Sequence, residues 1–215
     1  MKPLKKFIPR IKKEFHGPVL NLSNTHAHPM FEFDLWFKEA HEIETSVEVN
    51  AFTLSTISEN GWLDSRIVLM KSYSEEGIKF FTNYNSKKAK DLLNSNKVSV
   101  NFYWPDMNRQ IRLLGLVTKT SSEESREYFD SRPHESKISA FISKQSEKMD
   151  QLQREEFFNK LEENIEDFDI KEKWGGYCIK IMKAEFWQGQ RSRCHDRVVY
   201  ELSDKGAWDK FMLYP

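Results

Sequence analysis

The sequence predicts a mainly β protein with helices, of the α+β class, built on an antiparallel barrel or sandwich. Five short runs rich in Val, Ile, Phe and Thr follow one another between residues 49 and 121, and turn signals such as "SENG" and "SEEG" separate them. A block of charged, helix-like segments follows, after which the strand pattern returns near the C-terminus. Closely spaced strands joined by short turns are typical of antiparallel barrels and sandwiches.

Composition limits the classes of partner. The chain has 215 residues, enough to bury a sizeable core, and its 33 Lys and Arg residues balance 33 Asp and Glu residues. No global field therefore attracts nucleic acid or a membrane surface, and any cationic site must be local. Cys178 and Cys194 make neither a disulfide framework nor a zinc spacing, and no apolar stretch is long enough to span a bilayer. We predict a soluble, cytoplasmic protein.

The chain is predicted to begin with an extended arm over residues 1–30. Prolines at positions 3, 9, 18 and 29 interrupt any regular pattern there, and the first residues lack the apolar core of a secretion signal. The stretch "FEFDLWFKEAHEIE" then has Phe33, Trp36, Phe37 and Ala40 at helical spacing, which predicts an amphipathic helix. We expect residues 31–215 to form a single domain.

The next segments predict the β core and its helical insert. The five expected strands are "VNAFTLSTIS", "SRIVLMKSYS", "IKFFTNY", "KVSVNFYW" and "RQIRLLGLVTKTS". In "SSEESREYFDSRP", serine precedes two glutamates, which is the chemistry of a helix N-terminus, and proline ends the helix. Two more helices are expected in "SKISAFIS" and "DQLQREEFFNKLEENI", so that a helical insert covers about residues 121–170.

The C-terminal part is expected to return to strands. "GGYCIKIMKAEFWQ" is predicted to be a buried strand, and "RVVYEL" and "AWDKFMLYP" form a hairpin closed by "SDKG". Between them, "WQGQRSRCHDR" holds three arginines, whose guanidinium groups suit planar oxyanions and phosphates. A solvated, charged turn is the alternative. In an extended segment, Arg193 and His195 point to one side and Cys194 to the other.

A second candidate for anion binding is the stretch "NSKKAKDLL". It offers Asn85 or Ser86 as the N-cap of a helix, with Lys87 and Lys88 in the first turn, where they oppose the helix dipole. A bound anion would resolve that conflict, because free backbone N–H groups and lysines would then act together. An ordinary exposed lysine pair is the alternative.

A third candidate lies at the predicted end of the first insert helix. "YFDSRPHES" presents Tyr128, Arg132 and Ser136, whose phenol, guanidinium and hydroxyl could grip a phosphate. An exposed arginine at a helix end explains the same residues. "THAH" at residues 25–28 has no companion ligands, so we predict no metal there. The chain has no GxGxxG or GxxxxGK loop, so any phosphate site is made of side chains.

Eight short motifs carry a family resemblance: "RIVLMK", "FFTNYNSKKA", "RQIRLLG", "YFDSRPHES", "SKQS", "WGGY", "EFWQG" and "RCHDR". In order and spacing the chain resembles the pyridoxine/pyridoxamine 5'-phosphate oxidase family, from about residue 35 to the C-terminus. The resemblance implies an FMN-binding split β-barrel that forms a homodimer with FMN at the subunit interface. It also implies oxidation of pyridoxamine 5'-phosphate and pyridoxine 5'-phosphate to pyridoxal 5'-phosphate in vitamin B6 biosynthesis or salvage. A hydride would pass from substrate C4' to flavin N5, and O2 would accept the electrons and give H2O2.

The same resemblance implies roles for individual residues. The expected flavin-binding positions are Arg66, Ile67, Val68, Leu69, Met70, Lys71, Phe81, Thr82, Lys87, Lys88, Gln110, Gln145, Ser146, Trp187 and Arg197. The expected substrate-binding positions are Lys71, Tyr128, Arg132, Ser136, Arg193 and His195, of which Arg193 and His195 form the catalytic pair at the pyridine ring. Lys87 departs from the family, in which arginine is common there, and Met212 stands where arginine is usual.

Two other functions stay open at this point. A related split-barrel flavoenzyme could act on another small ring compound, although the intact set of substrate residues argues against it. A non-catalytic binder could hold flavin or pyridoxal phosphate. Release of peroxide with pyridoxamine 5'-phosphate separates the three functions.

Overall fold

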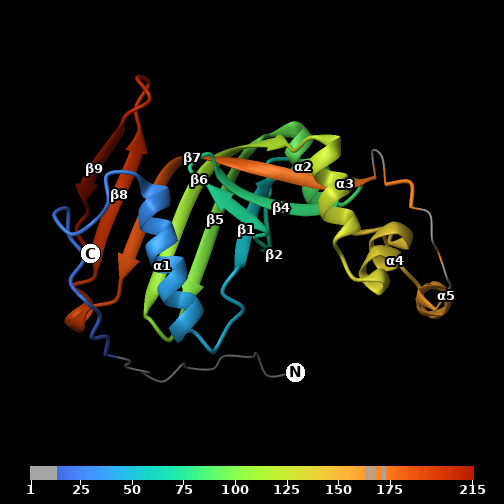
Figure 1. Ribbon diagram of the computed structural model, residues 1–215, viewed down its shortest axis with the longest axis horizontal. Helices are drawn as coiled ribbons and strands as arrows, with labels where there is room; N and C mark the ends of the chain where they lie inside the picture. The colour runs from blue at the N-terminus through green and yellow to red at the C-terminus, as the bar shows by residue number, and fades with distance from the viewer. Residues whose placement is uncertain (1–13, 163–164, 166–167, 171–172) are drawn as a thin grey trace, which may run out of the picture.

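Nine strands form one antiparallel sheet in the described part of the chain. The computed structural model describes residues 14–162, 165, 168–170 and 173–215. The strands follow the order β2-β1-β5-β6-β7-β4-β3, with β8 paired to β7 and β9 paired to β8. Their bounds are β1 Ala51–Ile57, β2 Leu63–Leu69, β3 Ser72–Ser74, β4 Gly77–Asn83, β5 Lys97–Trp104, β6 Arg109–Lys119, β7 Trp174–Gln188, β8 Asp196–Leu202 and β9 Trp208–Met212. The sheet curls into a half-barrel (Figure 1), which confirms the predicted mainly β, α+β class.

Helices lie against one face of this sheet and at one of its ends (Figure 1). They are α1 Pro29–Ile43, α2 Lys87–Asn94, α3 Ser122–Asp130, α4 His134–Ile142 and α5 Gln151–Leu161. Helix α1 buries Phe33, Trp36 and Ala40, as their helical spacing predicts. The ring of Phe33 lies 5.3 Å from that of Phe102 on β5, and the ring of Trp36 lies 5.2 Å from that of Phe186 on β7. Burial of these large rings holds α1 on the sheet.

Strand β7 connects the two ends of the molecule. It is 15 residues long and pairs with β6 along one edge. On its other edge, residues 174–179 pair with β4 and residues 183–188 pair with β8. The β8–β9 hairpin therefore lies at one end of the sheet, and β4 with α2 and α3 lies at the other (Figure 1).

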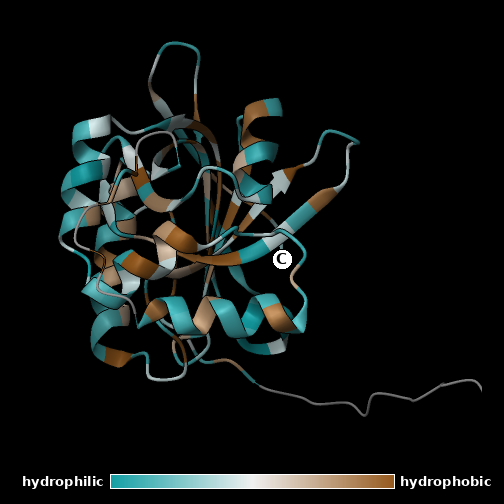
Figure 2. Ribbon diagram, turned by 90° about the vertical axis from the view of Figure 1, so that its right-hand side faces the viewer, coloured by the Kyte–Doolittle hydropathy of each residue, from teal (hydrophilic) through white to brown (hydrophobic). Residues whose placement is uncertain are grey.

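The helices between β6 and β7 have a small core of their own. Phe129 of α3 and Ile138 of α4 pack with Phe168, Ile170 and Trp174. Because Trp174 is the first residue of β7, this core joins the helices to the main sheet. Figure 2 shows apolar residues concentrated on the central strands, with polar residues on the surrounding loops and on much of the helical surface.

Residues 14–28 of the predicted arm form neither helix nor strand, and α1 begins at Pro29, just inside the expected end of the arm. The first part of the arm, residues 1–13, lies outside the described residues. The His28 ring accepts a hydrogen bond from the Met30 N–H, and His26 contacts Glu32 at 3.0 Å. The two histidines of "THAH" therefore contact the first turn of α1.

The remaining expectations for secondary structure are confirmed, with two corrections. The predicted strands and helices all have counterparts, and "SDKG" joins β8 to β9. The strand expected over residues 65–74 is instead two strands, because the chain changes partner at Met70 and Lys71: β2 pairs with β1, and β3 pairs with β4. Helix α5 ends at Leu161, before the expected residue 165. No helix in the described ranges is both long and apolar enough to cross a membrane.

Candidate functional site

A cleft of about 840 Å³ opens between strands β2 and β4, the start of α2 and the segment that joins α3 to α4. Its volume is typical of a site for a small molecule or cofactor. The cleft brings together many residues of both predicted sets: Arg66, Ile67, Val68, Leu69, Lys71, Phe81, Thr82, Lys87, Lys88, Tyr128, Arg132, Ser136, Gln145 and Ser146.

The other predicted residues lie outside this cleft. Met70 is buried in the main core, so its side chain does not line the cleft. Its carbonyl accepts a hydrogen bond from the Asn50 side chain. The rest lie on β6, β7 and β8 and in the turn before β8: Gln110, Trp187, Arg193, His195 and Arg197.

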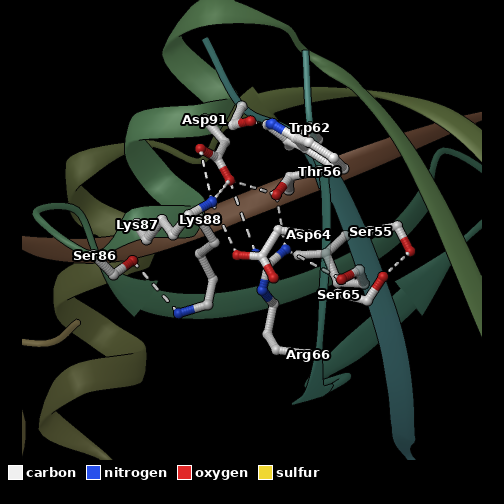
Figure 3. A network of polar contacts seen from close by, with 12 residues as sticks. Ser55, Thr56, Trp62, Asp64, Ser65, Arg66, Ser86, Lys87, Lys88 and Asp91 are labelled. Atoms are coloured by element: carbon white, nitrogen blue, oxygen red, sulfur yellow. Dashed lines mark hydrogen bonds and ion pairs between the residues drawn. The ribbon is translucent and has the colours of Figure 1, made fainter. Parts of the chain in front are cut away.

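One end of the cleft carries three cations from two elements. Arg66 is on β2, and Lys87 and Lys88 are the first two residues of α2. Two carboxylates lie among them, Asp64 from β2 and Asp91 from α2 (Figure 3). Because the N-terminus of α2 also presents backbone N–H groups without partners inside the helix, this end of the cleft favours an anion.

Ion pairs hold two of these cations. Arg66 Nη2 lies 2.8 Å from Asp64 Oδ2 and 3.8 Å from Asp91 Oδ2. Lys87 Nζ lies 2.9 Å from Asp64 Oδ2 and 3.2 Å from Asp91 Oδ2. The hydrogen bond from Lys87 is the main cause that lowers the pKa of Asp64, and the same bond raises the pKa of Lys87. Both groups therefore stay charged at neutral pH.

Lys88 differs because it is buried among neutral partners. Its Nζ donates to Thr82 Oγ1 at 3.1 Å, to Ser86 Oγ at 3.4 Å and to Gln145 Oε1 at 3.4 Å. Burial, with a smaller contribution from the charge of Arg66, lowers the pKa of Lys88 to about 8. An anion bound beside Lys88 would raise that pKa, because it favours the charged ammonium.

The opposite side of the cleft is aromatic. Phe81 and Tyr128 stack with ring centroids 4.1 Å apart, and the rings of Tyr128 and Trp174 are 6.0 Å apart and nearly parallel at 10°. The guanidinium of Arg132 lies 5.0 Å from the Trp174 ring centroid, and its Nη1 is buried without a hydrogen-bond partner. Burial also lowers the pKa of Arg132. A buried donor without an acceptor is unfavourable, so this guanidinium marks a second place for an anion.

The glycines of "WGGY" make this aromatic packing possible. A Cβ atom at Gly176 would lie 2.5 Å from Thr120 Oγ1 and 2.7 Å from the Phe81 ring. A Cβ atom at Gly175 would lie 2.4 Å from Tyr84 Oη. A side chain at Gly176 would therefore push Phe81, part of the wall of the cleft, away from β7, and one at Gly175 would displace Tyr84.

A second group of side chains gathers on the other half of β7. We name Gln110, Glu185, Trp187, His195 and Arg197 the hairpin cluster. Gln110 pairs in register with Trp187, and Trp187 pairs with Arg197, so these three lie in one row on one face of the sheet. Arg197 Nε donates to Glu185 Oε1 at 2.7 Å, and the ring of His195 lies 4.6 Å from that of Trp187.

The turn before β8 is not extended, so the side-chain alternation expected within "RCHDR" is wrong. Arg191–Arg193 forms a 3-10 turn in which Ser192 and Arg193 have φ angles of 55° and 63°. The Cys194 N–H closes the turn by donating to the Arg191 carbonyl at 3.0 Å. Arg193 and Cys194 are both exposed on this turn.

His195 is held in one tautomer. Its Nδ1 accepts a hydrogen bond from the Gln190 N–H at 3.1 Å. Because a backbone N–H can only donate, the neutral ring carries its proton on Nε2. Burial, and then the charge of Arg193, lowers the pKa of His195. The neutral ring with an Nε2–H donor is therefore favoured at neutral pH.

The cleft and the hairpin cluster lie far apart within one chain. Thr82 of the cleft pairs with Gly175 of β7, whereas Trp187 of the hairpin cluster is twelve residues further along the same strand. At about 3.3 Å per residue, this separation is roughly 40 Å along β7. Figure 1 shows the same separation between β4 and β8.

Sequence reasoning missed four residues that shape these sites. Asp91 had a signal, because it follows Lys87 by four residues, a spacing at which helix side chains meet. Trp174 also had one, as the first residue of the motif "WGGY". Asp64 and Glu185 had no signal in the sequence. Their partners lie on other elements: the packing of α2 brings Lys87 to Asp64, and the register of β8 brings Arg197 to Glu185.

Two family models match the chain. Residues 38–159 match the model described as pyridoxamine 5'-phosphate oxidase. Residues 174–215 match the model described as the pyridoxine 5'-phosphate oxidase C-terminal dimerisation region. The first match covers more than half of the chain and contains the cleft residues up to Ser146, and the second contains β7, β8 and β9.

Solved structures with similar folds include two with high TM-scores. PhzG from Burkholderia lata 383, in complex with tetrahydrophenazine-1-carboxylic acid, has a TM-score of 0.83 at 23% identity and covers 93% of this chain and 99% of its own. A pyridoxamine 5'-phosphate oxidase-related, FMN binding protein from Nostoc punctiforme PCC 73102 has a TM-score of 0.70 at 15% identity, covering 85% and 96%. These likenesses confirm the split β-barrel fold.

Curated relatives match the sequence over nearly its whole length. A pyridoxine/pyridoxamine 5'-phosphate oxidase from Leptospira interrogans serogroup Icterohaemorrhagiae serovar copenhageni is 41% identical over 211 residues, which are 97% of this chain and 98% of the relative. Another from Leptospira biflexa serovar Patoc is 44% identical over 192 residues, covering 87% and 89%. On the strength of this identity and of the match over residues 38–159, the chain belongs to the pyridoxine/pyridoxamine 5'-phosphate oxidase family.

Proposed function

We propose that this chain is an FMN-dependent oxidase that converts pyridoxamine 5'-phosphate and pyridoxine 5'-phosphate to pyridoxal 5'-phosphate. The observation that carries the proposal is identity of 38–44% with curated oxidases over most of the chain. The cleft supports it, because it offers two cationic places beside an aromatic wall. A flavin and a substrate that each bear a phosphate need two such places.

The first cationic place fits the phosphate of FMN. Arg66, Lys87 and Lys88 would hold the phosphate dianion together with the free N–H groups at the start of α2. Thr82 and Gln145, which accept hydrogen bonds from Lys88, would keep that ammonium directed into the cleft. When bound, FMN would supply the redox chemistry, taking a hydride from substrate C4' and passing two electrons to O2 to give H2O2; water would then convert the imine left by pyridoxamine 5'-phosphate to the aldehyde and release ammonia.

The second cationic place fits the substrate phosphate. Arg132 would supply the Nη1 donor that has no partner in the described chain, and a phosphate oxygen would satisfy it. Tyr128 and Ser136 would add hydroxyl donors from α3 and α4, and Lys71 would add a further charge from the strand side of the cleft. The stack of Phe81 and Tyr128 would give a flat ring an apolar surface beside that clamp.

The proposed catalytic pair, Arg193 and His195, is too far from the cleft of its own chain to act there, so a second chain is needed. Arg193 and His195 lie with the hairpin cluster, roughly 40 Å of strand away from the cleft of the same chain. We infer a homodimer in which the hairpin cluster of one chain covers the cleft of the other, with FMN at the interface. The match of residues 174–215 to a dimerisation region supports this arrangement. In it, the Nε2–H of His195 and the guanidinium of Arg193 would orient the pyridine ring for transfer of the hydride.

The activity is tested by measuring H2O2 release with pyridoxamine 5'-phosphate and FMN under air. We expect stoichiometric H2O2 and pyridoxal 5'-phosphate, and a yellow protein with about one flavin per chain. Yellow protein that turns over neither phosphate substrate would favour a flavoenzyme for another ring compound. Protein that binds flavin or pyridoxal 5'-phosphate without any turnover would favour a binder.

The shared site is tested by mixing two inactive variants. Arg132→Ala impairs the cleft and His195→Ala impairs the hairpin cluster, so each variant alone should keep at most about a tenth of the wild-type activity. If each site takes its cleft from one chain and its hairpin cluster from the other, a mixed dimer regains one intact site of two. Unfolding and refolding the variants together should then restore about a quarter of the wild-type activity. No recovery, although mixed dimers form, would place both halves of the site in one chain.

A further inference from the structure

We infer that Asp64 limits the affinity of this site for the FMN phosphate, because its carboxylate competes with that phosphate for Arg66 and Lys87; the inference rests on the proposed function. Asp64 lines the cleft, and its side chain is 40% exposed. Its Oδ2 lies 2.8 Å from Arg66 Nη2 and 2.9 Å from Lys87 Nζ (Figure 3). One carboxylate oxygen of a residue that lines the cleft thus contacts two of the cations that would hold the phosphate.

The two cations do not need Asp64 as an anchor. Arg66 Nη1 donates to Thr56 Oγ1 at 2.8 Å and to the Leu54 carbonyl at 3.2 Å, which fixes its guanidinium against β1. Asp91 is only 5% exposed and accepts a hydrogen bond from Thr56 Oγ1 at 2.7 Å. The same carboxylate of Asp91 lies 3.2 Å from Lys87 Nζ. Asp91 is therefore a buried anchor for these cations, whereas Asp64 is a partly exposed partner that a phosphate could replace.

The charges at this end of the cleft explain the competition. Two carboxylates oppose the three cations Arg66, Lys87 and Lys88, and no described carboxylate pairs with Lys88. A phosphate dianion that binds to all three cations must come close to the negative charge of Asp64. Like charges at such distances repel, and the phosphate must also displace the ion pairs that Asp64 makes with Arg66 and Lys87. Removing the charge of Asp64 should therefore strengthen the binding of phosphate.

The test compares Asp64→Asn with the wild type and with Glu201→Gln. Asparagine keeps the shape of aspartate and removes its charge. Glu201 forms an ion pair with Lys183 on the β8 side of the sheet, and its side chain is 45% exposed, so Glu201→Gln removes a similarly exposed charge far from the cleft of its own chain. Apoprotein of each form is titrated with FMN and with riboflavin, and flavin fluorescence is measured at low and high salt. The thermal shift of each apoprotein with inorganic phosphate is measured as well.

We expect Asp64→Asn to bind FMN about two- to tenfold more tightly than the wild type, the range that two partly exposed ion pairs allow, and to lose part of this gain at high salt. Riboflavin, which lacks the phosphate, should bind both proteins equally, and Glu201→Gln should behave like the wild type. Unchanged or weaker binding of FMN to Asp64→Asn, or an equal gain for riboflavin, overturns the inference.

The phosphate measurement separates this inference from the proposed function. If the wild type does not bind FMN but inorganic phosphate stabilises Asp64→Asn more than the wild type, the competition stands and the proposed cofactor is wrong. If the wild type binds FMN and Asp64→Asn gains nothing, the inference alone is wrong. If neither ligand binds to either protein, both are wrong.

Discussion

The cleft and the hairpin cluster each place a buried carboxylate near an arginine, but in different surroundings. In the cleft, the buried carboxylate of Asp91 lies beside Arg66, and in the hairpin cluster the buried carboxylate of Glu185 pairs with Arg197. The cleft has walls from β2, β4 and three helices, whereas the hairpin cluster lies on a sheet face of β6, β7 and β8. A walled cleft can enclose a ligand by itself, but a sheet face needs an opposing surface. Because of this difference, we expect that function requires the cleft of one chain and the hairpin cluster of a second chain.

The largest expected effect is on kcat/KM, in variants of the turn beside the hairpin cluster that still bind flavin at the cleft. Arg193→Ala and His195→Ala should each lower kcat/KM by about ten- to a thousandfold, roughly 1.4 to 4 kcal/mol, because each removes a group that we propose orients the substrate ring. FMN should stay bound, since Arg66, Lys87 and Lys88 are untouched. Steady-state kinetics and flavin absorbance of the same samples measure both quantities. Loss of FMN from Arg193→Ala, with normal turnover once FMN is added back, would contradict this division of roles.

A smaller effect is expected inside the hairpin cluster, at Arg197. Arg197→Ala should weaken the retention of FMN by about tenfold or more, because a charge-assisted contact is worth about 1.5–3 kcal/mol. The same change leaves the buried carboxylate of Glu185 with Arg112 as its remaining ion-pair partner among the described residues. Dialysis followed by flavin absorbance measures the retention. If Arg197→Ala keeps its flavin and loses only turnover, Arg197 acts on the substrate like its neighbours.

The pH dependence of FMN binding should depend on the cleft and not on the hairpin cluster. Burial lowers the pKa of Lys88 from 10.5 to about 8, so the free protein loses this charge as the pH rises through about 8. FMN affinity should be level between about pH 7 and 8, where the phosphate is a dianion, and should fall above pH 8 by at most about tenfold per pH unit. Titrations between pH 6 and about 10 check this, and the fall should disappear in Lys88→Met.

The stability of the apoprotein should change with pH in the opposite direction to FMN affinity. The folded pKa of Lys88 lies below its unfolded value of 10.5, so the charged ammonium destabilises the folded state. The contribution of Lys88 to the free energy of unfolding should therefore rise between about pH 8 and 10.5. Urea unfolding of the wild type and of Lys88→Met isolates this contribution. An equal pH dependence in the two proteins would mean that Lys88 has an ordinary pKa.

The smallest expected effect is at Cys194, between the two residues that we propose act on the substrate. Its side chain is exposed, and its Sγ lies 3.8 Å from the Ser192 carbonyl. Cys194→Ala should change kcat/KM less than about twofold and stability by less than about 0.5 kcal/mol. The kinetic assay used for Arg193→Ala checks this. A large loss of activity would show that the turn itself, rather than the side chains of Arg193 and His195 alone, is sensitive to substitution.

Features that depend on neighbours in the sequence were predictable. The strand "KVSVNFYW" alternates buried and more exposed residues as its pattern indicates. Ser121 caps α3 by accepting a hydrogen bond from the Glu124 N–H at 3.1 Å, as "SSEE" predicts. Lys87 and Lys88 occupy the first turn of α2, so the cationic helix start could be recognised before the fold was known. Caps and amphipathic patterns are encoded within a few residues, which is why sequence suffices for them.

Features that depend on distant partners could not be predicted in the same way. The break at Met70 arises because β2 and β3 pair with different strands, and the left-handed residues of the Arg191–Arg193 turn have no marker such as glycine. The ion pair of Asp64 with Lys87 requires α2 to pack beside β2. The division of one set of predicted residues between the two ends of β7 follows from strand order and register. Residue types and local periodicity determine which chemistry the chain carries, but the distances between those groups depend on contacts between segments remote in sequence, which form only when the sheet and its helices pack.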